Sequence, residues 1–127
     1  MAAQQQCVLV VDDDDSIRRM IATALERRGY SLCEARNGKE ALEEMRLGST
    51  DLVVLDLMMP EISGWDVLAE RDRDPRLRRI PVIVITANRS PQLAHAVSSN
   101  ICALLPKPFD LDALYALVEA CLEQNAA

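Results

Sequence analysis

The stretch "CVLVVDDDDSIRRM", residues 7–20, places four consecutive aspartates directly after a short apolar run. The run predicts a strand over residues 7–11, because parallel strands that are covered on both faces are apolar almost throughout. Neighbouring carboxylates repel one another, and a pair about 4 Å apart costs roughly 4 kcal/mol at an effective dielectric constant of ~20. Such a cluster at the end of a buried strand calls for a compensating cation.

Strand-like and helix-like segments alternate along the chain. Residues 30–35 alternate as an edge strand does, and further strands are predicted over residues 52–57, 82–86 and 103–105. Amphipathic helices are predicted over residues 17–28, 39–47 and 64–73, from Ser90, and after Asp110. The first of these helices has an apolar stripe made of Ile17, Met20, Ile21, Ala24 and Leu25.

The alternation predicts the fold class. Five β/α units predict an α/β, doubly wound sandwich of three layers, since parallel strands need right-handed crossover helices. We expect one domain over residues 1–127, with an ordered core over about residues 6–123.

The composition is acidic, with a net charge of −6 and a sequence pI near 4.7. This balance argues against a nucleic-acid surface and favours metal ions or basic partners. The apolar runs are shorter than the ~18 residues of a membrane span. The start "MAAQQQ" also lacks the basic residues of a signal peptide, so we expect a soluble, cytoplasmic protein. The single cysteines at positions 7, 33, 102 and 121 are expected to be buried, reduced thiols.

Polar side chains follow four of the predicted strands. Asp12 and Asp13 follow the first strand, Asp56 and Thr86 lie at the ends of the third and fourth, and Lys107 follows the fifth. Ligands of open α/β sheets bind outside the carboxyl ends of the strands, so we expect these side chains to converge. Three carboxylates in such close proximity cannot all be ionised at low free-energy cost unless a cation is present. Their hard oxygen atoms suit Mg²⁺.

The other two aspartates of the run have a different predicted role. Asp14 and Asp15 fall at the start of the helix that contains Ile17. There an aspartate can cap free N–H groups, and negative charge is favourable near the positive end of the helix dipole. The run therefore divides into two metal-site and two helix-start aspartates.

Four stretches carry a resemblance to a known family: "VLVVDDDDSIRR", "DLVVLDLMMPEISGWDVL", "IPVIVITA" and "LPKPF". Over essentially its whole length, the chain resembles the receiver domain of two-component response regulators (CheY-like). The resemblance implies a (βα)5, flavodoxin-like fold with strand order 2-1-3-4-5. It also implies a phosphorylation-activated switch that takes a phosphoryl group from the histidine of a sensor kinase or phosphotransfer protein.

The resemblance also assigns a metal site. It implies that Asp13 and Asp56 bind Mg²⁺ directly, that Asp12 binds it through water, and that the backbone carbonyl of Met58 completes the protein ligands. Mn²⁺ is expected to substitute for Mg²⁺.

By the same resemblance, Asp56 is the phosphoacceptor, Thr86 hydrogen-bonds a phosphoryl oxygen and Lys107 pairs with the phosphoryl group. Met58 and Asn88 correspond to positions that tune the rate of dephosphorylation. The domain is then not an enzyme in the usual sense, since it only phosphorylates itself from small donors and dephosphorylates itself. The resemblance also implies that Lys107–Pro108 is a cis peptide bond.

The chain departs from the family pattern at the position of the switch residue. Leu104 stands where a tyrosine or phenylalanine is common, on a face that the fourth helix, fifth strand and fifth helix would offer to a downstream partner. No direct nucleic-acid or membrane contact is expected. The arginine-rich segment 71–79 is interpreted as a solvated helix end rather than as a docking patch.

Two other functions compete with the switch. A haloacid-dehalogenase-type phosphohydrolase also uses a strand-end aspartate, but it expects a second aspartate two residues later, where this chain has Met58. A pseudo-receiver that only binds proteins usually lacks an acidic residue or the lysine, and here all are present.

Overall fold

A five-stranded parallel sheet forms the centre of the protein in the computed structural model, which describes residues 5–59, 61–87 and 101–124. The strands are β1 (Cys7–Val11), β2 (Ser31–Ala35), β3 (Leu52–Asp56), β4 (Val82–Thr86) and β5 (Ala103–Pro106). Their order is β2-β1-β3-β4-β5, and every pair is parallel. The predicted strand order is confirmed, with β2 at one edge of the sheet.

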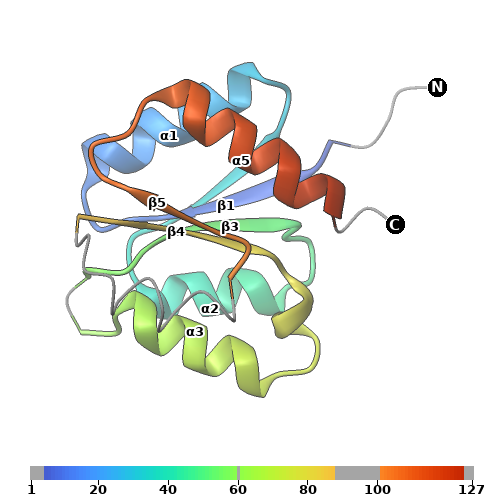
Figure 1. The fold of residues 1–127 in the computed structure, drawn as a ribbon. Coiled ribbons are helices and arrows are strands. Elements are labelled where there is room, and N and C mark those ends of the chain that lie inside the picture. Colours follow the sequence, from blue (N-terminus) through green and yellow to red (C-terminus); the bar gives the residue numbers. More distant parts are fainter. Residues whose placement is uncertain (1–4, 60, 88–100, 125–127) are drawn as a thin grey trace.

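Helices cover both faces of this sheet (Figure 1). The helices α1 (Asp15–Arg27) and α5 (Leu111–Gln124) lie on one face, and α2 (Gly38–Arg46) and α3 (Gly64–Arg73) lie on the other. A short 3-10 helix, η1 (Leu77–Arg79), leads into β4. The helix predicted from Ser90 lies outside the described residues. None of the described helices is long and apolar enough to cross a membrane.

The strands are apolar because both of their faces are buried. Along β1, Leu9 and Val11 pack toward α2 and α3, whereas Val8 and Val10 pack toward α1 and α5. Every residue of β3 and β4 is buried. The core is therefore two aliphatic layers separated by one sheet.

The buried face of α1 is shifted from the predicted stripe. Ile21, Ala24 and Leu25 of the stripe are buried, but Met20 is 48% exposed, and Arg18 and Ala22 are buried outside the stripe. Residues 18, 21, 22 and 25 also follow the i, i+3, i+4, i+7 spacing of one helix face. The stripe was predicted from apolar residues alone, so a buried arginine could not contribute to it.

The interpretation of segment 71–79 is wrong for its first residue. Arg71 is buried, and its Nε and Nη2 donate hydrogen bonds to the backbone carbonyls of Ile80 and Arg78, at 2.9 and 3.1 Å. Its Nη1 contacts Asp72 at 3.0 Å. Arg71 thus ties the end of α3 to the turn that enters β4.

The expectation of reduced thiols is wrong for two of the four cysteines. Cys102, just before β5, forms a disulfide with Cys121 of α5, 19 residues away in sequence. Cys7 and Cys33 are free, and their sulfur atoms lie 3.9 Å apart on neighbouring strands. The disulfide depends on how α5 packs against β5, and the sequence spacing carries no signal of that packing.

The disulfide predicts a thiol count. Protein purified without reductant and unfolded in denaturant should show two reactive thiols, those of Cys7 and Cys33, and four after reduction. Cys7→Ser should lower both counts by one, whereas Cys102→Ser should raise the unreduced count from two to three because it frees Cys121. Four reactive thiols before reduction would contradict the bond.

Candidate functional site

The carboxyl ends of the strands, which lie at the left of the sheet in Figure 1, bring together three carboxylates. The register pairs Val11 of β1 with Leu55 of β3, so the next residues, Asp12 and Asp56, are neighbours. Carboxylate oxygens of Asp12, Asp13 and Asp56 all lie within 4.8 Å of one another. The predicted convergence of these side chains is confirmed.

Lys107 brings a positive charge to the same place. Its Nζ lies 3.7 Å from Oδ2 of Asp12 and 3.9 Å from Oδ2 of Asp56, so one ammonium group forms ion pairs with two carboxylates. The backbone N–H of Lys107 donates to the carbonyl of Thr86 at 2.9 Å, which holds the end of β5 against the end of β4. The Lys107–Pro108 bond is cis, as the resemblance implied. Thr86 is fully buried at the end of β4.

Asp56 is difficult to ionise in this setting. Its side chain is 6% exposed, and its Oδ1 accepts one hydrogen bond, from the Met58 N–H at 3.1 Å. Burial, with a contribution from the charge of Asp12, raises the pKa of Asp56 to about 6, against the opposing effects of the Met58 N–H and Lys107. Burial also raises the pKa of Asp12. Lys107 alone does not offset the cost of ionising these buried carboxylates. Their oxygen atoms are ligands that suit a hard divalent cation.

The loop after β3 approaches the site closely at Gly64. The Gly64 N–H donates to the Leu57 carbonyl at 3.1 Å. A Cβ at this position would lie 2.6 Å from the Leu57 Cα and 2.7 Å from the Asp56 carbonyl oxygen. Only glycine therefore fits here, and α3 begins at once with a capping box between Ser63 and Asp66.

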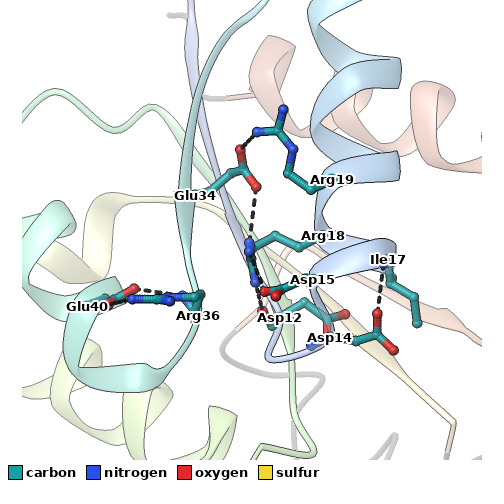
Figure 2. Close-up of polar contacts among 9 residues, drawn as sticks. All are labelled: Asp12, Asp14, Asp15, Ile17, Arg18, Arg19, Glu34, Arg36 and Glu40. Atoms are coloured by element: carbon teal, nitrogen blue, oxygen red, sulfur yellow. Dashed lines mark hydrogen bonds and ion pairs between the residues drawn. The ribbon is translucent and has the colours of Figure 1, made fainter.

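The aspartate run divides as predicted. Asp14 is the N-cap of α1, and its Oδ1 accepts the Ile17 N–H at 3.0 Å (Figure 2). Asp15 lies in the first turn of α1 and forms an ion pair with Arg18 at 2.6 Å. Neither belongs to the group of three carboxylates that meets at the sheet edge.

Other predicted residues lie apart from the carboxylates or outside the described residues. The Met58 side chain is mostly exposed, so its described contact with the site is its backbone N–H. Leu104 on β5 is partly buried against the layer that faces α2 and α3. Asn88 lies outside the described residues. Sequence reasoning missed Arg18, whose one signal is a basic residue a turn after the acidic run.

The family model for the response regulator receiver domain matches residues 8–119. The chain belongs to this family. Its fold is similar to the receiver domain of Francisella response regulator 1452, with a TM-score of 0.87, 31% identity, and coverage of 94% of this chain and 98% of that one. It is also similar to the Vibrio cholerae chemotaxis protein CheY4, with a TM-score of 0.85, 28% identity, and coverage of 93% and 99%.

Curated relatives are longer than this receiver domain. The chain is 36% identical over 121 residues to the transcriptional regulatory protein GlrR of Escherichia coli, and the match covers 94% of the chain and 27% of GlrR. It is 36% identical over 115 residues to the CAI-1 autoinducer sensor kinase/phosphatase CqsS of Vibrio cholerae, covering 89% of the chain and 17% of CqsS. The chain thus spans about a quarter of the length of GlrR.

The raised pKa of Asp56 predicts a pH-dependent stability in metal-free buffer. The folded state binds the proton of the Asp56 carboxyl group more tightly than the unfolded state does. This difference stabilises the folded protein fully below pH 3.8, and the stabilisation is lost as the pH rises through about 6. Asp56→Asn should therefore be more stable than the wild type at neutral pH by about 1–3 kcal/mol, with the difference vanishing near pH 4. Urea unfolding in EDTA at several pH values measures it.

The control is Glu43→Gln, which neutralises an exposed carboxylate in the middle of α2, away from both helix ends. Its stability should follow that of the wild type at every pH. An Asp56→Asn variant that is equally stable, or less stable, at neutral pH would show that the Asp56 carboxylate is not costly in the folded protein.

Proposed function

We propose that this receiver domain is a phosphorylation-activated signalling switch whose phosphoacceptor is Asp56. The observation that carries the proposal is the cluster of Asp12, Asp13 and Asp56 within 4.8 Å, with Lys107 at 3.9 Å from Asp56. In this cluster Asp56 has two other carboxylates and the ammonium group of Lys107 as direct neighbours. A carboxylate that attacks phosphorus needs neutralising groups in that arrangement.

The transfer follows from these positions. An Asp56 carboxylate oxygen forms a bond to phosphorus, the P–N bond to the donor's histidine breaks, and its electron pair stays on the donor imidazole. Lys107 then pairs with the phosphoryl group, and the Thr86 hydroxyl donates a hydrogen bond to a phosphoryl oxygen. The same acyl phosphate is lost by attack of water in line with the Asp56 oxygen, at a rate that Met58 and Asn88 tune.

Mg²⁺ is the cofactor that the donor chemistry favours, and Mn²⁺ can replace it. Asp13 and Asp56 would hold it directly, Asp12 would hold it through water, and the Met58 carbonyl would complete the protein ligands. Such a cation would supply charge neutralisation between the carboxylate and the phosphoryl oxygens. Three close carboxylates, two of them buried, support this ligand set.

The partners follow from the family. A receiver of a two-component system takes its phosphoryl group from a sensor histidine kinase or a histidine phosphotransfer protein, which we place with this chain in the cytoplasm. The signal leaves through Thr86 and Leu104 to the face that β5 and α5 would share with the predicted fourth helix, which lies outside the described residues, and a downstream partner binds there. The match over residues 8–119 supports a single receiver domain over residues 1–127, with its core over about residues 6–123.

Mg²⁺ should stabilise the folded protein. Relief of the repulsion among Asp12, Asp13 and Asp56 is worth about 1–3 kcal/mol at saturating metal through linkage. Thermal melts in EDTA and in millimolar Mg²⁺ measure the rise in melting temperature. Asp13→Ala should lose most of the rise. A melting temperature that does not respond to Mg²⁺ would rule out the metal site.

Asp56 should be the only residue that is phosphorylated. Intact mass after treatment with acetyl phosphate and Mg²⁺ should increase by one phosphoryl group, and the adduct should be absent in Asp56→Asn. Asp14→Asn is the matched control, because asparagine caps a helix as well as aspartate does, and it should still be labelled. An adduct that remains in Asp56→Asn would mean that another residue is the acceptor.

A further inference from the structure

Arg18 joins three acceptors around the acidic loop (Figure 2). The side chain is 8% exposed, and its Nη1 donates to the backbone carbonyl of Asp12 at 3.0 Å. Its Nη2 donates to Oδ1 of Asp15 at 2.6 Å, and its Nε donates to Oε1 of Glu34 on β2 at 3.1 Å. One rigid, planar group therefore links the β1–α1 loop, the first turn of α1 and the edge strand.

The contact with Asp12 is to its backbone and not to its carboxylate. The Asp12 N–H donates to the Ala35 carbonyl at 3.2 Å, and Asp12 Oδ1 accepts the Asp14 N–H at 2.9 Å. With the hydrogen bond from Arg18 to its carbonyl, Asp12 is held on both sides. That carbonyl belongs to the peptide group that leads to Asp13, so Arg18 sets the orientation of this peptide group.

Asp13 depends on that peptide group more than its neighbours do. Asp12 and Asp56 are buried, whereas Asp13 is exposed. In the described parts of the chain, no hydrogen bond or ion pair holds the Asp13 carboxylate. Its place within 4.8 Å of the other two carboxylates is therefore set by the backbone on which it is carried.

We propose that Arg18 is a positioning residue for the metal site: by holding the Asp12–Asp13 peptide group, it keeps the Asp13 carboxylate directed toward Asp56. The inference rests on the proposed function, because it takes Mg²⁺ as the ion that this site binds. Arg18 does not itself contact the cation, and it acts through the backbone.

The charge around Arg18 distinguishes it from a counter-ion. Asp15 and Glu34 both pair with its guanidinium, and Glu34 is itself also paired with Arg19. Lys107, in contrast, contacts the carboxylates of Asp12 and Asp56. The carboxylates of Asp15 and Glu34 thus match the charge of Arg18 locally, and its contact with the site is the hydrogen bond to the Asp12 carbonyl.

Positioning and plain electrostatics predict opposite changes in metal affinity. If Arg18 acted on the metal only through its charge, its removal would let Mg²⁺ bind more tightly, because one repelling cation is lost. If it positions Asp13, the removal weakens binding. Outer-shell partners of metal ligands are typically worth about tenfold or more in affinity.

The test is a Mg²⁺ titration of the whole chain at a temperature where every variant is folded. Isothermal titration calorimetry measures the dissociation constant and needs no reporter side chain. Arg18→Met should raise the Mg²⁺ dissociation constant about tenfold. Arg18→Lys should raise it as well, since lysine keeps the charge but lacks the planar fork of three donors.

Two further variants distinguish the positioning role of Arg18 from general effects of charge and packing. Arg19→Met removes a neighbouring charge and an ion pair with Glu34 but no contact with Asp12, so its dissociation constant should match the wild type. Glu34→Gln loosens Arg18 from the other side and should weaken Mg²⁺ binding less than Arg18→Met does. In the metal-free protein, the amide resonances of Asp13 and Asp14 should shift in Arg18→Lys and remain in place in Arg19→Met.

The outcomes are distinguishable. Unchanged Mg²⁺ affinity in Arg18→Lys, even with a lower melting temperature, would leave Arg18 a merely structural role and overturn the inference. Tighter binding in Arg18→Met would also overturn it, in favour of a charge effect. If the wild type binds no Mg²⁺, the proposed metal site and the inference are both overturned. If the wild type binds Mg²⁺ and the Arg18 variants bind it equally well, the inference alone is overturned.

Discussion

Repulsion among the carboxylates of Asp12, Asp13 and Asp56 is the constraint around which this end of the molecule is organised. Their oxygens lie within 4.8 Å of one another, and Asp12 and Asp56 are 2% and 5% exposed, so water screens them poorly. The strands that carry them form the centre of the core and must stay apolar. The positive charge that offsets the repulsion therefore has to come from beyond the strand ends. Lys107 supplies part of it and, in the proposed function, Mg²⁺ supplies the rest.

The two cationic side chains near this site have different roles. Lys107 lies 3.7 and 3.9 Å from the carboxylates of Asp12 and Asp56, so it is a counter-ion and competes with a metal for the same oxygens. Arg18 is paired with Asp15 and Glu34 and contacts the Asp12 carbonyl, so it restrains the backbone instead. In the proposed function the site holds a cation and then a phosphoryl group, so it needs a positive charge that can move as well as ligands that stay in place. The flexible lysine stem suits the first need and the planar guanidinium suits the second.

The sequence by itself determined the fold class and the place of the acidic site. Hydrophobic periodicity predicted the strands and the described helices to within a few residues, because a strand buried on both faces is apolar throughout and a surface helix is apolar along one stripe. The convergence of Asp12, Asp13 and Asp56 followed from topology, since parallel strands end at one edge of the sheet whatever their other side chains are. The cap at Asp14 is local, so sequence sufficed there too. The roles of Asp56, Thr86 and Lys107 came from the family motifs and remain proposals.

Tertiary structure alone decided which distant residues become partners. Arg18 meets Glu34 from 16 residues away, and Cys102 bonds to Cys121 from 19 residues away, and neither spacing is informative before α1 and α5 are packed on the sheet. The exposure of Met20 and the burial of Arg18 have the same origin. Successive residues point about 100° apart around a helix, so a rotation of one residue exchanges a buried side chain for an exposed one. Periodicity in a sequence locates a helix face only to about that precision, and packing against the sheet determines the remainder.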